Sequence, residues 1–317
     1  MKHIFGPIPS RRLGRSLGID PIPLKTCNWN CIYCQLGRTR PVTNERREYV
    51  DPTTIVAQLH SVLAAHAPGE IDWLTFVGSG EPTLNSSLGS MIRQVKAISD
   101  IPVAVITNGA LLFLPEVQQD LLVADAVLPT LDAGSAVLYR KINRPHPGVS
   151  FEQVVAGLIA FRKVYQGKYW VEIMMVKGIN DTEPALRELA VVLDQIEPDE
   201  IHINQPIRPP AEPWVQPTDD EGFLRARAIL GDKARVFTFP EGHFDFGQYN
   251  DPVDAILAII TRHPMRQSEL EQTLKEWGKD DVGQALKKLH ASGRAQIVER
   301  YGVHFWSAAT SYYPNLK

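Results

Sequence analysis

Cys27, Cys31 and Cys34 are the only cysteines in the chain. Thiolates are soft ligands that suit iron–sulfur clusters and zinc. The spacing C-x3-C-x2-C places three sulfurs on one short loop, and three protein ligands on a four-iron cubane leave one iron open to a chelating cofactor. The alternative is a zinc site completed by a distant histidine. Zinc sites usually contain paired C-x2-C motifs, and this chain has no second pair.

A glycine-rich segment, from Gly78 through Ser79 and Gly80 to Glu81 and Pro82, follows a second predicted strand. Glycine lets a backbone approach a ligand closely, and a glutamate offers an acceptor for an ammonium group. Such turns are common after strands. Its place after the cysteine loop makes this one a candidate for binding a cofactor.

Two further polar segments end predicted strands. Residues 107–109 contain Asn108, and residues 130–132 end with Asp132. Polar residues at the carboxyl ends of barrel strands are often functional, although many only cap the next helix. Asn108 and Asp132 are therefore candidates for contact with a cofactor.

The cysteine spacing, with aromatic Tyr33 before the third cysteine, resembles the motif of the radical S-adenosylmethionine (SAM) superfamily. The resemblance implies a [4Fe–4S] cluster on the three cysteines and reductive cleavage of SAM to methionine and a 5′-deoxyadenosyl radical. It places Tyr33 near the adenine and Gly78, Gly80 and Glu81 at the methionine amino group. Ser79 departs from the usual Gly-Gly-Glu. An electron donor such as flavodoxin or ferredoxin is also implied.

A narrower resemblance covers roughly residues 5–240. Residues 9–14, 143–148, 177–181 and 208–212 resemble a radical SAM group often labelled wyosine-synthetase-related. Wyosine synthetase itself modifies a guanosine in tRNA and carries a second cluster. That cluster needs further cysteines, which this chain does not have.

Several arginines are candidates for a substrate site. Arg144 lies in a basic segment with Arg140, Lys141 and His146, and Arg208 lies in a loop stiffened by prolines. Arginine binds phosphate or carboxylate through two parallel hydrogen bonds. The other interpretation is that these arginines pair with acidic side chains inside the fold. No side chain is assigned as a catalytic acid or base.

The elements that carry these residues alternate between strand and helix. Strands are predicted at residues 15–20, 71–77, 103–107, 125–131, 170–176 and 200–204, and helices at 52–66, 84–99, 151–165 and 183–196. Alternating units of this kind predict a parallel sheet. The fold class is α/β, a partial (β/α)6 TIM-type barrel, with a doubly wound open sheet as the main competitor. Five prolines in residues 205–217 predict an irregular loop, and a helix at 219–230 and a strand at 235–239 follow.

Residues 252–309 have a different pattern. Helices at 253–261, 267–274 and 280–291 precede strands at 295–300 and 304–307, which describes a winged helix. The predicted domains are a barrel at 1–240, a linker at 241–251 and a winged-helix-like domain with its tail at 252–317. Because every candidate cofactor residue precedes residue 250, the barrel is expected to keep its cluster and cleave SAM without the small domain.

The composition bounds the function. A net charge of −3 gives no global attraction to nucleic acid, but residues 1–40 carry seven Lys and Arg against one acid. The sequence shows no signal peptide and no membrane span, so a cytoplasmic enzyme is expected. Modification of a macromolecule, RNA slightly ahead of protein or peptide, is the first hypothesis. The others are a radical SAM enzyme acting on a small metabolite and a zinc-stabilised, non-catalytic regulator that binds nucleic acid.

Overall fold

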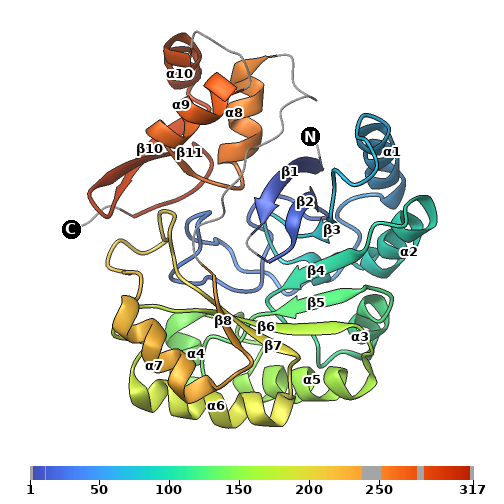
Figure 1. Ribbon diagram of the computed structural model, residues 1–317, viewed down its shortest axis with the longest axis vertical. Coiled ribbons are helices and arrows are strands. Elements are labelled where there is room, and N and C mark those ends of the chain that lie inside the picture. The colour runs from blue at the N-terminus through green and yellow to red at the C-terminus, as the bar shows by residue number, and fades with distance from the viewer. Residues whose placement is uncertain (1–2, 11, 238–250, 277–281, 315–317) are drawn as a thin grey trace.

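The computed structural model describes residues 3–10, 12–237, 251–276 and 282–314 (Figure 1). Its main feature is an eight-stranded sheet whose strands follow one another in chain order. β1 is antiparallel to β2, and every later neighbour is parallel. The strands are β1 (Ile4–Ser10), β2 (Gly14–Ile19), β3 (Trp73–Phe76), β4 (Val103–Thr107), β5 (Ala126–Pro129), β6 (Lys168–Met174), β7 (Glu200–Asn204) and β8 (Ala234–Val236).

Helices connect the parallel strands and lie along the outer face of the curved sheet (Figure 1). Six βα units run from β2 to the last helix before β8, so the predicted partial (β/α)6 barrel is confirmed. The helices are α1 (Pro52–Leu63), α2 (Leu88–Ile98), α3 (Pro115–Leu121), α4 (Ala136–Ile142), α5 (Phe151–Val164), α6 (Glu183–Ile196) and α7 (Asp220–Leu230), with a short 3-10 helix, η1 (Pro82–Leu84).

The structure adds elements that the sequence pattern did not predict. β1 contains a glycine and two prolines, which favour turns over strands, and its pairing with β2 shifts register between Phe5 and Ile8. Proline is tolerated in a strand at the edge of a sheet, where fewer backbone donors are needed. α3 and α4 span only seven residues each, too few for a clear helical period.

The interior of the barrel is packed at the amino ends of its strands. The rings of Trp73 on β3 and Trp170 on β6 lie 6.1 Å apart, although two strands separate β3 from β6 in the sheet. They therefore meet across the interior. Ala104 and Ala126, on the two strands between them, are fully buried, and their small side chains leave room for the indoles. These side chains therefore fill the interior of the barrel at the amino ends of the strands.

The C-terminal part has a core of its own, which includes Ile256, Leu270, Leu289 and Trp306. The element order agrees with the predicted helices and hairpin. A third strand, β9, completes an antiparallel sheet in the order β10–β11–β9. The winged-helix assignment stays a prediction, and most of the predicted linker lies outside the described residues. The elements are α8 (Pro252–Ile260), β9 (Met265–Arg266), α9 (Gln267–Glu276), α10 (Val282–Ala291), β10 (Ala295–Arg300) and β11 (Val303–Ala308).

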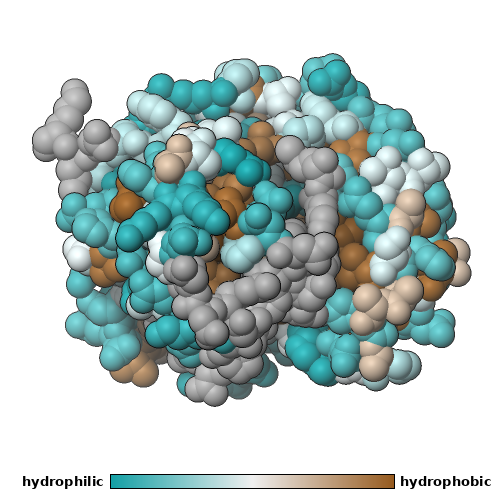
Figure 2. Space-filling view, turned by 90° about the horizontal axis from the view of Figure 1, so that it is seen from above, coloured by the Kyte–Doolittle hydropathy of each residue, from teal (hydrophilic) through white to brown (hydrophobic). Residues whose placement is uncertain are grey.

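The face drawn in Figure 2 is mostly polar where it is described, and its hydrophobic residues lie in small separate groups. None of the helices among the described residues is long and apolar enough to cross a bilayer.

Candidate functional site

The cysteine loop leaves the carboxyl end of β2 and is held from several sides. The backbone N–H groups of Asn30 and Ile32 donate to the carbonyls of Asn143 (3.0 Å) and Ile142 (2.9 Å) at the end of α4. On its other side, the N–H of Glu212 donates to the carbonyl of Ile32 (2.9 Å). Ile32 is fully buried, so it anchors the loop in the core. The three cysteines are free thiols and each keeps part of its surface open.

The surroundings of Cys27 and Cys31 disfavour isolated thiolates. Burial raises the pKa of Cys27 to about 12, and the Glu81 carboxylate adds to this shift. Burial also raises the pKa of Cys31 well above its ordinary value, with contributions from negative charge on Cys27, Asp132 and Cys34. Thiolate is the form that binds metal, so a site of this kind needs a cationic centre that stabilises several thiolates together. Three soft donors on one loop, in a chain without a fourth cysteine, fit a cubane cluster with three protein ligands.

Each sulfur has one side-chain nitrogen near it. Lys25 Nζ donates to Cys34 Sγ at 3.3 Å, and the amide nitrogens of Asn108 and Asn143 lie 3.8 Å from Cys27 Sγ and Cys31 Sγ. Hydrogen bonds to cluster sulfurs are one of the means by which proteins tune iron–sulfur centres. Asn108 is a predicted site residue. Lys25 and Asn143 were not predicted, because neither lies at the end of a predicted strand.

The glycine-rich segment packs directly against the start of the cysteine loop. The N–H of Lys25 donates to the carbonyl of Ser79 (2.6 Å), and the N–H of Glu81 donates to the carbonyl of Thr26 (2.9 Å). A Cβ on Gly80 would lie 1.9 Å from that Thr26 oxygen, so only glycine fits there. The glycine-rich segment and the cysteine loop are therefore joined through their backbones.

Glu81 is buried and its carboxylate is used within the protein. It accepts hydrogen bonds from the Thr83 N–H (3.0 Å) and hydroxyl (2.7 Å), capping η1. It also accepts from the Thr107 hydroxyl (2.6 Å) and the Asn108 N–H (2.7 Å) at the end of β4. Burial raises its pKa against the effect of these donors. Glu81 thus joins two strand-end loops, and an ammonium group would have to share its oxygens with four protein donors.

Asp132, just after β5, links three more elements. Its carboxylate accepts from the Tyr33 hydroxyl (2.5 Å), the Asn143 amide (2.6 Å) and the Met174 N–H (2.8 Å). Burial raises the pKa of Asp132 to about 6, although these three donors oppose the shift. Two predicted cofactor residues, Tyr33 and Asp132, are in direct contact. The aromatic side chain of the cysteine motif is therefore fixed by the end of the fourth parallel strand.

Arg144 is paired, and Arg208 reaches the small domain. Arg144 and Arg38 both bind the buried Glu212, and Arg38 does so through two hydrogen bonds of 2.7 Å. Burial disfavours the charged form of Glu212, but these guanidinium groups hold its pKa below the usual value. Arg208 donates to the carbonyl of Pro264. Glu212 belongs to the segment 208–212, but its ion pairs with the arginines were not predicted. The neighbouring residues in the sequence do not indicate which arginine it contacts.

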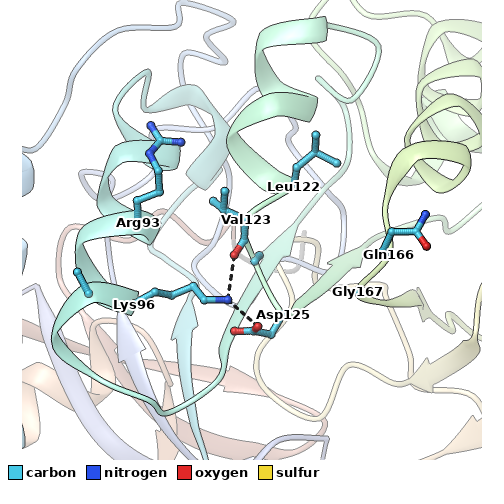
Figure 3. Close-up of a pocket in the computed structure, with 9 residues that line it drawn as sticks. Arg93, Lys96, Leu122, Val123, Asp125, Gln166 and Gly167 are labelled. Carbon is cyan, nitrogen blue, oxygen red and sulfur yellow. Dashed lines mark hydrogen bonds and ion pairs between the residues drawn. The ribbon is translucent and has the colours of Figure 1, made fainter.

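A hollow of about 720 Å³ lies at the opposite end of the barrel (Figure 3). Its lining includes Arg93, Lys96, Asp125 and Gln166, near the amino ends of β4, β5 and β6. Lys96 bridges the wall by donating to Asp125 (2.6 Å) and to the carbonyl of Val123 (3.2 Å). The cysteine loop and the other candidate cofactor residues follow the carboxyl ends of the strands, so this hollow is not part of their site.

Comparison with known proteins agrees with the geometry. The sequence profile of the Radical SAM superfamily matches residues 22–190. A UPF0026 protein of Methanocaldococcus jannaschii is 37% identical over 281 residues, which cover 87% of this chain and 87% of the relative. A protein of Brachyspira hyodysenteriae named GTPase Obg is 41% identical over 298 residues, or 93% of this chain. The chain spans only 43% of the length of that relative.

Among solved structures, native anSMEcpe with bound AdoMet has a TM-score of 0.50 and 16% sequence identity. The match covers 68% of this chain and 58% of that one. At this level of identity the similarity concerns the fold alone.

Proposed function

Because the chain belongs to the radical SAM superfamily, we propose that Cys27, Cys31 and Cys34 ligate its [4Fe–4S] cluster and that the loops around them bind SAM. The protein is an enzyme and uses these two cofactors. When bound, the cluster supplies the electron that cleaves SAM to methionine and a 5′-deoxyadenosyl radical, which abstracts hydrogen from a substrate. The observation that best supports the ligand assignment is the arrangement of one nitrogen donor beside each of the three sulfurs.

The remaining candidate residues have distinct roles in this proposal. Gly78 and Gly80 let the backbone pack closely against Asp20 and Thr26, and Glu81 fixes this segment to the end of β4. In this proposal the segment binds the methionine end of SAM. Tyr33 faces the adenine side, in an orientation set by Asp132. Asn108, whose amide also donates to Asn28 (2.7 Å), lies between Cys27 and Glu81 of the glycine-rich segment.

The test is SAM cleavage by the anaerobically reconstituted protein after reduction with dithionite. We expect four iron and four sulfide per chain and slow formation of 5′-deoxyadenosine without any substrate. Glu81→Gln keeps the shape of the side chain but weakens the hydrogen bonds to Thr107 and Asn108, so we expect weaker SAM binding with the cluster intact. Stoichiometric zinc, without the visible absorption of an iron–sulfur cluster, would overturn the assignment.

We further propose that the substrate is a macromolecule, with RNA favoured over protein or peptide. Two large aromatic side chains are exposed beside the cysteine loop, Trp214 by 47% and Tyr312 by 49%. The guanidinium of Arg40 lies 5.0 Å from the centre of the Tyr312 ring. Both residues are linked through the backbone to one ion pair, because the backbone carbonyl of Tyr312 accepts from the backbone N–H of Arg38 (2.8 Å) and Trp214 follows Glu212 by two residues. Unpaired bases stack on aromatic rings and arginine planes in this way.

Binding of a fluorescent single-stranded RNA 20-mer tests this proposal. Trp214→Ala and Tyr312→Ala should each weaken binding by about tenfold, the effect of losing one stacked base. Leu224→Ala on α7, which removes a side chain that is even more exposed (69%), should not. Affinity should fall as salt rises, because phosphate contacts release counterions. Equal RNA binding by all variants, or binding that salt does not change, would contradict the RNA assignment.

A one-electron donor such as flavodoxin or ferredoxin is the partner that this chemistry requires. We place the enzyme in the cytoplasm, where such donors and free thiols are maintained. Co-purification of the cluster-bearing protein with a cytoplasmic fraction and its reduction by flavodoxin are the corresponding measurements.

A further inference from the structure

The small domain contacts the loops that carry the cofactor residues. From the cysteine loop, the Gln35 amide donates to the carbonyl of Arg262 (2.7 Å). In return, the Tyr313 hydroxyl donates to the carbonyl of Gln35. The Tyr301 hydroxyl reaches the carbonyl of Pro206 (3.0 Å) in the proline-rich loop. These contacts lie on several separate segments of the small domain, so it is docked on the carboxyl end of the barrel.

One contact in this interface is a buried ion pair. Nε of Arg262, which follows α8, lies 2.9 Å from Oδ2 of Asp20, at the end of β2. The two side chains are only 9% and 3% exposed. The guanidinium also lies 4.7 Å from the centre of the Phe5 ring. A charge buried this deeply is stable only while its partner is present, and removing one member of such a pair is strongly destabilising.

Asp20 continues this contact into the glycine-rich segment. Its Oδ2 accepts from the Ser79 hydroxyl (2.7 Å), and its Oδ1 accepts from the Ser79 N–H (3.2 Å). A Cβ on Gly78 would lie 2.4 Å from Asp20 Oδ1, so the backbone before Ser79 is also in close contact with the carboxylate. The serine that departs from the family's Gly-Gly-Glu pattern is therefore the residue that Asp20 binds.

We propose that Arg262 and Asp20 are positioning residues for SAM, and that the small domain is a structural part of the cofactor site. Arg262 binds the Asp20 carboxylate and fixes its position, and Asp20 holds Ser79 so that the backbone from Gly78 to Glu81 has its binding conformation. This inference rests on the proposed role of that segment in binding SAM. It differs from the expectation that the barrel binds and cleaves SAM independently of residues after 250.

The proposal separates SAM binding from cluster assembly. The cysteine loop is held by Asn143, Ile142 and Glu212. Gln35 in this loop binds the backbone carbonyl of Arg262, which a substitution of the side chain leaves in place. Loss of the ion pair should therefore leave the cluster in place. Without Arg262, the buried Asp20 carboxylate loses its cationic partner, and Ser79 loses an acceptor that is fixed in position. We expect SAM affinity to fall about tenfold or more.

The experiment uses the full-length, anaerobically reconstituted enzyme. Iron content, the EPR spectrum of the reduced cluster and the dissociation constant of SAM are measured for Arg262→Met, Asp20→Asn and the double variant. Arg262→Met should retain its iron and bind SAM about tenfold more weakly. The double variant should recover part of this loss, because a neutral asparagine needs no cation and its amide oxygen still accepts from Ser79. Arg294→Met, which breaks an exposed pair with Asp254 in the same domain, is the control and should behave as wild type.

The outcomes distinguish failure of the proposed function from failure of the inference about the small domain. If the wild-type protein assembles no cluster and binds no SAM, the proposed function fails. If wild type binds SAM and Arg262→Met binds it equally well, only the inference on the small domain fails. It also fails if the double variant binds no better than Arg262→Met, because the pair would then stabilise docking without acting through Ser79. Arg262→Lys, which keeps the charge, gives a second measurement should the methionine variant fold poorly, and it should bind SAM with intermediate affinity.

Discussion

The two ends of the barrel differ in how they hold charge. At the amino end, the hollow of about 720 Å³ is crossed by Lys96 and Asp125, whose side chains are both more than one third exposed (Figure 3). At the carboxyl end, Asp20, Glu81 and Asp132 are all buried, and each accepts hydrogen bonds from other segments of the chain. The hollow at the amino end therefore has exposed charged groups, whereas the candidate cofactor site at the carboxyl end has buried ones.

The difference has an energetic cause. An exposed ion pair contributes at most about 1 kcal/mol, so the amino end can keep or lose its pairs at little cost. A buried carboxylate is strongly destabilising unless several donors satisfy it. Three such groups at one end constrain the loops of many strands at once. Buried carboxyl groups whose pKa is raised, such as Glu81 and Asp132, are typical of functional sites.

The sharpest test of this comparison is removal of a sulfur. Cys31→Ala should abolish cluster assembly and all formation of 5′-deoxyadenosine, because two thiolates cannot replace three on the cubane. Iron and sulfide analysis with product detection by chromatography measures this. A variant that retains four irons and cleaves SAM would show that the cofactor site does not lie at the carboxyl end of the barrel.

The second test concerns His202 on β7, inside the barrel between the rings of Trp170 and Phe237. Burial lowers its pKa to about 4, against the opposing effect of Glu200. Between pH 4 and 6.5 the unfolded chain binds more protons at this site than the folded one. Its contribution to stability is thus present at pH 7 and is lost as the pH falls. We expect a decrease of about 2 kcal/mol in the free energy of unfolding between pH 7 and pH 5.

Anaerobic urea unfolding of His202→Gln at both pH values measures this contribution. The variant should lose less stability than wild type on acidification, and the exposed His304→Gln should lose as much as wild type. If the free energy of unfolding depends on pH identically in wild type and His202→Gln, the interior of the barrel does not disfavour a protonated His202.

The third test uses Lys25, which donates to Cys34 Sγ at 3.3 Å. Reduction adds negative charge to a cluster, so a nearby ammonium stabilises the reduced state. Lys25→Met should lower the reduction potential. Because the side chain is partly exposed, we expect a change of about 1 kcal/mol, roughly 45 mV for one electron. Potentiometric titration followed by EPR measures the change, and Lys177→Met, which breaks an exposed pair with Asp219, is the control. An unchanged potential would show that Lys25 does not face the cluster.

The smallest effect is expected at the amino end. Lys96→Met removes the contact across the hollow in Figure 3 and should change the free energy of unfolding by less than about 1 kcal/mol. SAM cleavage should proceed at the wild-type rate. A marked loss of SAM cleavage with the fold intact would show that the hollow at the amino end is part of the cofactor site.

Local patterns in the sequence were sufficient for much of this description. The cysteine spacing, the glycine-rich segment and the polar ends of the strands each depend on neighbouring residues, and β4, β7 and α6 have the predicted bounds. β1 escaped prediction because an edge strand tolerates the glycine and prolines that favour a turn. Alternating periodicity predicted the order of the six parallel strands, but not α3, the helix between β4 and β5.

Other features were decided only by tertiary structure. Glu81 is a local candidate for ligand binding, but its donors Thr107 and Asn108 come from the next strand. Arg144 pairs with Glu212, 68 residues away, and Arg262 pairs with Asp20, 242 residues away. No local signal indicates these partners. The cost of burying an unpaired charge selects them when the loops pack together, and that cost exists only in the folded protein.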